Sequence, residues 1–278
     1  MKNSMQLKAR VKNLSSQKSI EPEVVFRTFM MECILERISA SNYRDNFILK
    51  GGVLIASIVG IEARSTMDID TYLKAESLTE DKLVATLSEI VDIPVDDGVS
   101  FEIKKVSTIR EFANQPCFRV LLEASFDGIK QFIQVDISTG DYIIPKEIEY
   151  EYRLLFEDRT ISLMAYNLET ILAEKFEAII TLGIASTRLR DYYDVYLLTS
   201  TQPYNSAIFR MALEAITKNR NTFAQVVNSR ESIDAISKNE DMIVKWKRYQ
   251  DNNVYAAGIL WEMVIDSLLE LQTAKEDA

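Results

Sequence analysis

Histidine is absent from this chain of 278 residues. Without an imidazole, the chain cannot carry a Ser-His-Asp or Cys-His catalytic arrangement, a zinc site built on histidine, or a histidine general base. Any chemistry must therefore rest on carboxylates, lysine, arginine and the backbone. The two cysteines, Cys33 and Cys117, lie far apart without metal-ligand spacing, so we expect no disulfide framework and a reducing, cytoplasmic setting.

Glycine and proline are also scarce, with eight and five residues, which argues against a β-sandwich or a disordered chain and favours a helix-rich protein. No apolar run approaches the roughly 20 residues that span a bilayer. The polar N-terminus shows no signal peptide, so we expect no membrane association. The length suits one large or two small domains.

The net charge of −10 argues against indiscriminate binding to nucleic acid, which depends mainly on lysine and arginine. Residues 1–20 are an exception, because they contain five basic residues and no acidic one. This segment is either a basic arm that contacts RNA or a solvated terminus, and the sequence leaves both interpretations open.

The stretch Phe47–Leu73 contains the most informative pattern. A short apolar run ends at Leu49 and is followed by Gly51-Gly52, where the missing Cβ atoms let backbone N–H groups approach a ligand closely. Val53–Val59 is then predicted to be helical. A phosphate at the glycine pair would meet unpaired N–H groups and the positive end of a helix dipole.

Two aspartates follow on a predicted strand, Met67–Leu73. Side chains two residues apart in a strand share a face, so Asp68 and Asp70 project together while Ile69 turns into the core. Two neighbouring carboxylates repel one another unless a hard cation lies between them, and Mg²⁺ prefers such oxygen ligands. A solvated surface strand is the alternative.

A third aspartate lies in a predicted hairpin. The β-rich runs Cys117–Phe126 and Ile129–Ile137 are joined by Asp127-Gly128, a strong hairpin signal. Asp136 has β-branched neighbours on both sides, so it points to the face opposite theirs. If this strand lies beside that of Asp68 and Asp70, Asp136 completes a cluster of three carboxylates; an ordinary exposed aspartate would give the same pattern.

The chain is predicted to be helical after the sheet, which we expect to end at Gly140–Pro145. Asn167 can cap a helix that runs to about Leu182. Lys175 falls on the apolar stripe of that helix. A lysine there either extends along the surface to reach water or points into a site that binds anions, such as a triphosphate.

Asp191 lies on a mainly apolar helix face, four residues before Val195. A partly buried acid commonly orients a basic partner, here Lys175 or one of two nearby arginines, and Arg188 could bind phosphate. Helix capping or a structural ion pair is the alternative. The remaining patterns, over Ala207–Thr217, Phe223–Val227, Ile233–Tyr249 and Ala256–Leu271, are also predicted to be helical.

The order Gly-Gly, helix, Asp-x-Asp resembles the first motif of the polymerase-β-like nucleotidyltransferases. The fuller string, Leu49-Lys50-Gly51-Gly52 with Arg64-Ser65-Thr66 just before Asp68, is similar to one branch, the AbiEii/AbiGii family of nucleotidyltransferase toxins. This resemblance implies an α/β fold, in which a small mixed twisted sheet with flanking helices precedes a C-terminal α-helical domain. We place the two domains at residues 1–160 and 161–278.

The resemblance also implies roles for the residues singled out above. Two Mg²⁺ ions are expected at Asp68, Asp70 and Asp136, with Lys175 and Asp191 as further catalytic residues. The residues expected to bind the phosphates of an NTP are Gly51, Gly52, Ser65, Thr66, Lys175 and Arg188.

Members of this family are toxins of toxin–antitoxin pairs linked to phage defence by abortive infection. The resemblance therefore implies transfer of a nucleotide from an NTP to RNA, such as a tRNA 3′ end, and a cognate antitoxin. Two alternatives remain open. One is a small-molecule nucleotidyltransferase of the antibiotic-modifying type, which the acidic net charge favours. The other is a non-catalytic nucleotide-binding regulatory module.

Overall fold

The computed structural model describes residues 1, 3–75, 78–112 and 115–276. The chain forms two compact units. The first comprises Met1–Asp141 and Ile148–Ala165, and the second comprises Tyr142–Glu147 and Tyr166–Ala278. The domain boundary that the sequence suggested, between residues 160 and 161, falls inside the last strand of the first unit.

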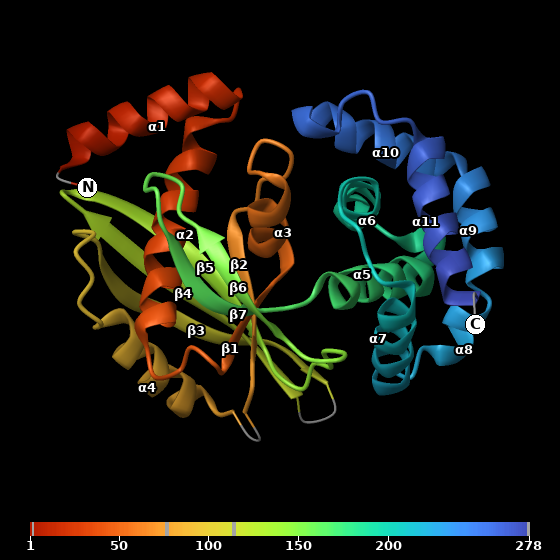
Figure 1. The fold of residues 1–278 in the computed structure, drawn as a ribbon, viewed down its shortest axis with the longest axis horizontal. Helices are drawn as coiled ribbons and strands as arrows, with labels where there is room; N and C mark the ends of the chain where they lie inside the picture. The colour runs from red at the N-terminus through yellow and green to blue at the C-terminus, as the bar shows by residue number, and fades with distance from the viewer. Residues whose placement is uncertain (2, 76–77, 113–114, 277–278) are drawn as a thin grey trace. The chain divides into compact units, whose positions relative to one another are not determined.

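The described residues of the first unit form a mixed, seven-stranded sheet in the order β3-β4-β5-β2-β1-β7-β6 (Figure 1). Its strands are β1 Phe47–Lys50, β2 Asp68–Leu73, β3 Ser100–Phe112, β4 Gln115–Phe126, β5 Ile129–Ser138, β6 Ile148–Arg153 and β7 Thr160–Ala165. Two pairs are parallel, β2 with β5 and β1 with β7, and the other pairs are antiparallel. The predicted mixed sheet is therefore confirmed.

The expectation that the sheet ends at Gly140–Pro145 was wrong. Two further strands, β6 and β7, rejoin it after that segment, and β7 pairs in parallel with β1 through Ile48 and Met164. This pairing joins residues far apart in the sequence, so no local pattern in either strand reveals its partner.

The hairpin of β4 and β5 has the predicted two-residue turn. Asp127 and Gly128 have φ angles of 44° and 80°, the positive values that a type I′ turn requires. A turn of this length fixes the register, so Phe126 lies opposite Ile129 and every later pair follows in order. Along β5, Ile133, Val135 and Ile137 are buried, which leaves the alternate residues on the other face.

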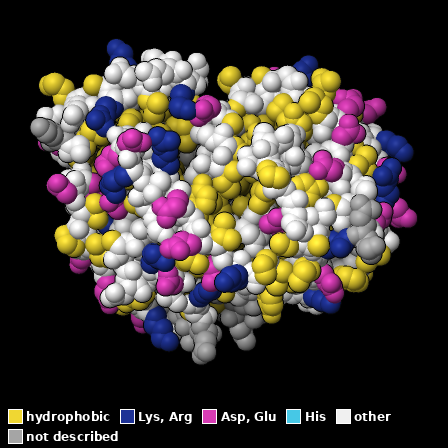
Figure 2. Space-filling model, viewed as in Figure 1, with side chains coloured by type: hydrophobic (Ala, Val, Ile, Leu, Met, Phe, Trp, Pro, Cys, Tyr) yellow, Lys and Arg dark blue, Asp and Glu magenta, His cyan; other side chains and the backbone are white. Residues whose placement is uncertain are grey.

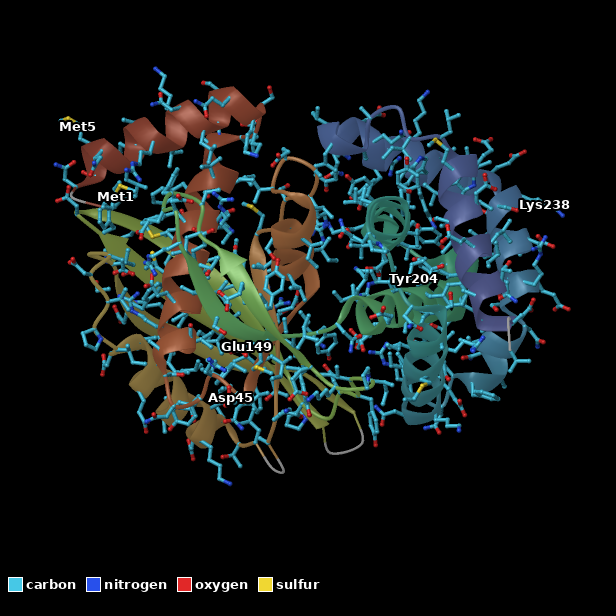
Figure 3. All side chains as sticks on the ribbon, in the orientation of Figure 1. Met1, Met5, Asp45, Glu149, Tyr204 and Lys238 are labelled. Atoms are coloured by element: carbon cyan, nitrogen blue, oxygen red, sulfur yellow. The ribbon has the colours of Figure 1, made fainter. Side chains whose placement is uncertain are left out.

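The described residues of the first unit also form the helices α1 Ser4–Lys18, α2 Pro22–Ala40, α3 Gly51–Val59 and α4 Glu80–Val91. Helix α2 contacts β5 and β7, and α4 contacts β3. Inside this layer, Arg37 of α2 donates to both carboxylate oxygens of Asp97 and to the Val99 carbonyl. Near the surface, Arg44 is ion-paired with Asp45 and Glu149, both labelled in Figure 3, and so joins the loop after α2 to β6.

The second unit is helical (Figure 1). Its elements are α5 Leu168–Leu182, η1 Gly183–Ala185, α6 Leu189–Thr201, α7 Ser206–Asn219, α8 Phe223–Val227, α9 Ser229–Lys238, α10 Glu240–Asn252, η2 Val254–Ala256 and α11 Trp261–Glu276. As predicted, Asn167 caps α5 by accepting from the Thr170 N–H. The pattern expected to be one helix over Ile233–Tyr249 is two, because Asn239 ends α9 and caps α10.

Charges of both signs are interspersed on the face shown in Figure 2 rather than separated into large fields. Within the part of the chain that the structure describes, no helix combines the length and apolar character that crossing a membrane requires.

Glu32 of α2 is a buried acid with a testable pH dependence. Its carboxylate accepts from the Leu155 N–H and from the Tyr152 hydroxyl. Burial, reinforced by the charges of Glu157 and Glu36, raises its pKa from 4.5 to about 8. The folded chain therefore holds this proton more tightly than the unfolded chain, and stability is lost as the pH rises from about 4.5 through about 8.

We expect Glu32→Gln, which cannot ionise, to melt close to the parent protein at pH 5 and about 5 °C or more above it at pH 9. Thermal denaturation across this pH range measures the difference. Glu23→Gln is the control, because it removes a carboxylate from the same helix that is ion-paired with Arg27. If the melting temperature of Glu32→Gln falls with rising pH in parallel with that of the parent, the raised pKa of Glu32 does not cause the loss of stability.

Candidate active site

Four charged residues lie side by side across the sheet. The register pairs Lys50 with Asp70, Asp70 with Asp136, and Asp136 with Arg119, on strands β1, β2, β5 and β4. Because partners that lie directly opposite share a face of the sheet, these side chains form one row. In that row two carboxylates lie between two cations.

Asp68 and Asp70 lie on the same face of β2, separated by the fully buried Ile69. Asp68 accepts a hydrogen bond of 2.8 Å from the Thr66 hydroxyl, and Asp70 accepts one from the Gly52 N–H. Burial, and after it the charge of Asp68, raises the pKa of Asp70 from 3.8 to about 6. Asp136 adds to this effect and Lys50 opposes it.

The glycine pair fits closely against these carboxylates. Gly51 has a φ of +65°, and a Cβ there would lie 2.1 Å from Oδ2 of Asp70. A Cβ on Gly52 would lie 2.5 Å from the Thr66 hydroxyl oxygen. Both positions therefore exclude a side chain, for steric reasons that involve the predicted site residues themselves. Ser65 is half-buried, whereas Thr66 is buried and its hydroxyl donates to Asp68.

Arg119 holds Asp136 by two parallel hydrogen bonds. Its Nε donates to Oδ1 at 2.9 Å and its Nη2 donates to Oδ2 at 2.8 Å, so both carboxylate oxygens are engaged. The side chain of Arg119 is 44% exposed and that of Asp136 is 16% exposed. At the other end of the row, Lys50 is ion-paired with Asp141, which also accepts from Ser138.

The donor chemistry of this row fits a divalent metal ion. The two aspartates of the row and the neighbouring Asp68 offer only oxygen ligands, which Mg²⁺ prefers, and beyond the effect of burial the charges of Asp68 and Asp136 help to raise the pKa of Asp70. Yet no group of three possible metal-binding side chains is already drawn together among the described residues. Both oxygens of Asp136, the third carboxylate, accept hydrogen bonds from Arg119 instead.

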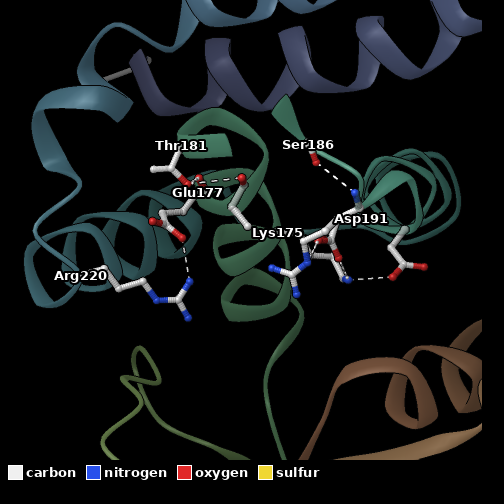
Figure 4. Close-up of polar contacts among 9 residues, drawn as sticks. Lys175, Glu177, Thr181, Ser186, Asp191 and Arg220 are labelled. Atoms are coloured by element: carbon white, nitrogen blue, oxygen red, sulfur yellow. Dashed lines mark hydrogen bonds and ion pairs between the residues drawn. The ribbon is translucent and has the colours of Figure 1, made fainter. Parts of the chain in front are cut away.

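The other predicted site residues form a cluster within the second unit (Figure 4). Lys175 of α5 is ion-paired with Asp191 and Asp194 of α6 at 2.8 Å and 2.7 Å. Arg188 contacts Asp191 at 3.3 Å. Burial by itself lowers the pKa of Lys175, but the charges of Asp194 and Asp191 outweigh it and the net pKa is raised. Lys175 is therefore cationic, and this cluster is neutral as a whole.

Sequence reasoning missed the part that Arg119, Lys50 and Asp141 play around the carboxylates. A signal for Arg119 was present, because the two-residue turn fixes the register of the hairpin. Counting outward from Asp127-Gly128 puts Arg119 directly opposite Asp136. The position of Lys50 depends on the pairing of β1 with β2, and that of Asp141 depends on the path of the chain after β5. No comparable local signal exists for either residue.

Comparisons with known proteins place the chain in a family. The family model described as nucleotidyl transferase AbiEii toxin of a type IV toxin–antitoxin system matches residues 33–265. No curated protein matches the sequence.

Two crystal structures from Helicobacter pylori share the fold. The first, of a protein assigned as a nucleotidyltransferase, is 11% identical with a TM-score of 0.52, and the match covers 92% of this chain and 96% of that one. The second, of the protein JHP933, is 12% identical with a TM-score of 0.51, and the match covers 92% and 93%. At these identities the likeness concerns the fold alone.

Proposed function

The chain belongs to the AbiEii family of nucleotidyl transferase toxins, and from this membership we propose that it transfers a nucleoside monophosphate from an NTP to RNA. The family implies an NTP substrate and an antitoxin partner. More specifically, we propose that the RNA acceptor is a tRNA 3′ end and that the protein acts in phage defence. The observation that carries the chemistry is the row in which Asp70 and Asp136 lie directly opposite each other beside the glycine pair.

Asp68, Asp70 and Asp136 are the residues that would hold Mg²⁺, and two ions are expected there. Such ions, when bound, neutralise phosphate charge and lower the pKa of an attacking hydroxyl. The raised pKa of Asp70 supports this assignment, because the neighbouring charges of Asp68 and Asp136 add to the effect of burial.

The remaining residues would bind and orient the reactants. The N–H groups of Gly51 and Gly52, at the start of α3, together with Ser65 and Thr66 would bind the β- and γ-phosphates. Lys175 and Arg188 would supply positive charge to the triphosphate, and Asp191 would orient both of them. Asp136 would accept the hydroxyl proton as the acceptor oxygen bonds to the α-phosphorus and pyrophosphate leaves.

Helix α1 supports an RNA acceptor. Lys8, Arg10 and Lys12 are exposed on it, and no residue of the helix is acidic, although the whole chain has a net charge of −10. A local basic surface of this kind is what binding to RNA phosphates requires.

Radiolabelled NTPs offered separately with total tRNA and with small hydroxyl or amine compounds test the proposed acceptor. We expect the label to appear in tRNA, to depend on Mg²⁺, and to be lost on treatment with a nuclease. A Lys8→Glu/Lys12→Glu double variant should label tRNA more weakly, with the difference narrowing as salt rises, because fewer phosphate contacts make the salt dependence shallower. Label found only on small acceptors would support the antibiotic-modifying alternative and refute the RNA proposal.

A further inference from the structure

The contact between Arg119 and Asp136 engages the very oxygen atoms that a metal ion would need. Both oxygens of Asp136 accept hydrogen bonds from one guanidinium, in the fork geometry that arginine forms with carboxylates and phosphates alike. Arg119 and a metal ion at Asp136 are therefore alternatives. Since the Arg119 side chain is 44% exposed, the pair contributes little net stability and can be exchanged.

We propose that Arg119 holds Asp136 in the metal-free protein, is released when a divalent ion takes that carboxylate, and then binds a backbone phosphate of a polynucleotide acceptor. The inference rests on the proposed function and deepens it. It names a residue on the acceptor side of the site and the chemistry of the acceptor that this residue recognises.

The order of strands places Arg119 on the acceptor side. Gly51 directly follows Lys50 at one end of the row, and Arg119 lies at the other end. Three strand spacings separate the two ends, about 14 Å at roughly 4.8 Å each. Phosphates bound at the glycine pair therefore lie on the opposite side of the carboxylates from Arg119. A phosphate that reaches Arg119 belongs to the other reactant.

The surroundings of Arg119 fit a polynucleotide better than a small hydroxyl compound. Phe132 lies four residues from Asp136 on the same strand, so both side chains share one face of β5. Its side chain is 49% exposed, which is unusual for phenylalanine and leaves a ring on which a base can stack. Gln134 lies between them on that face. An acceptor with both bases and phosphates would use the ring and the guanidinium together.

Electron paramagnetic resonance can monitor a titration of the nucleotide-free protein with Mn²⁺. This titration tests whether Arg119 and a metal ion compete for Asp136, and it requires no NTP transfer. We expect Arg119→Ala to bind Mn²⁺ about fivefold more tightly than the parent, the size of one half-exposed ion pair, with Arg119→Lys in between. Lys130→Ala is the matched control, because it removes a cation paired with Glu123 on the same sheet. It should bind Mn²⁺ as the parent does. Mn²⁺ affinity of Arg119→Ala no higher than that of Lys130→Ala would overturn the exchange.

Binding of tRNA at constant ionic strength tests the second part of the proposal, that the released Arg119 binds a phosphate of the acceptor. With Mn²⁺ present and no NTP, Arg119→Ala should bind tRNA about tenfold more weakly than the parent, and Arg119→Lys should recover part of that loss. Nucleotide affinity should stay within about twofold in both variants, because Arg119 lies away from the glycine pair. A loss of nucleotide affinity with unchanged tRNA affinity would refute the acceptor role.

Failure of the proposed function gives a different result. If Asp70→Asn binds Mn²⁺ as tightly as the parent, the metal site itself is wrong, whatever Arg119 does. If Asp70→Asn loses Mn²⁺ while Arg119→Ala binds it no better than the parent, the metal site stands and only the inference about Arg119 fails.

Discussion

Asp70→Asn is expected to lose NTP transfer by about 100-fold or more, the effect of deleting one well-placed charge-stabilising group. Asparagine keeps the size of the side chain and can still accept from the Gly52 N–H, but it removes the negative charge at the centre of the row. Initial rates of label transfer at saturating Mg²⁺ measure the loss. Asp45→Asn, which removes an exposed carboxylate in the loop after α2, is the control and should keep the parent rate.

The same substitution should leave the fold intact or make it more stable. The pKa of Asp70 is raised to about 6 in the folded chain, so its ionised form opposes folding above that pH. Without metal at pH 7.5, Asp70→Asn should therefore melt at or above the parent temperature, gaining up to about 3 kcal/mol. Loss of activity without loss of stability identifies a functional residue, whereas an inactive and unstable variant would indicate a structural role.

Gly51→Ala is expected to reduce transfer by a similar factor, about 100-fold, although it changes no charge. The new Cβ would lie 2.1 Å from Oδ2 of Asp70 and 2.7 Å from its Cβ, so Asp70 must move away from its place in the row. Alanine at a φ of +65° also strains the backbone, by about 1–2 kcal/mol. Transfer rates and melting temperatures, measured on the same preparation, separate the two effects.

Gly128→Ala provides the matched control for that strain. Gly128 has a φ of +80°, and a Cβ there would have no atom within 4 Å. It should therefore lose a similar amount of stability while keeping the parent rate of transfer. If the two glycine variants lose activity equally, the close fit between Gly51 and Asp70 has no functional importance.

Local patterns predicted the elements that depend on neighbours in sequence. The turn residues Asp127-Gly128 gave the hairpin of β4 and β5, and Asn167 gave the start of α5. The order of the motif from Gly51 to Asp70 revealed the family resemblance, and that resemblance implied the fold class. These predictions depend on backbone geometry and capping, which a few adjacent residues determine.

What the sequence did not reveal depends on contacts between distant segments. The return of β7 to pair with β1 is one example, and the ion pair of Lys50 with Asp141 is another. The break between α9 and α10 has a different cause. The cap at Asn239, followed by Glu240 and Asp241, is a local signal, but the apolar periodicity continues through it and suggested one helix.

The engagement of Asp136 by Arg119 lies between these cases. The register of the hairpin made their pairing predictable, but the choice of partner for Asp136 depended on where β2 would lie. The sequence led us to expect only carboxylates and a metal ion around Asp136, whereas the structure pairs this carboxylate with Arg119.

Whether the three aspartates bind metal beside the nucleotide can be decided by a crystal structure of the protein with Mn²⁺ and a non-hydrolysable NTP analogue, in which anomalous scattering locates the metal. We expect anomalous peaks bound by Asp68, Asp70 and Asp136, a triphosphate at Gly51 and Gly52, and an Arg119 side chain released from Asp136. Metal bound elsewhere, or Asp136 still held by Arg119 with metal and nucleotide in place, would contradict it.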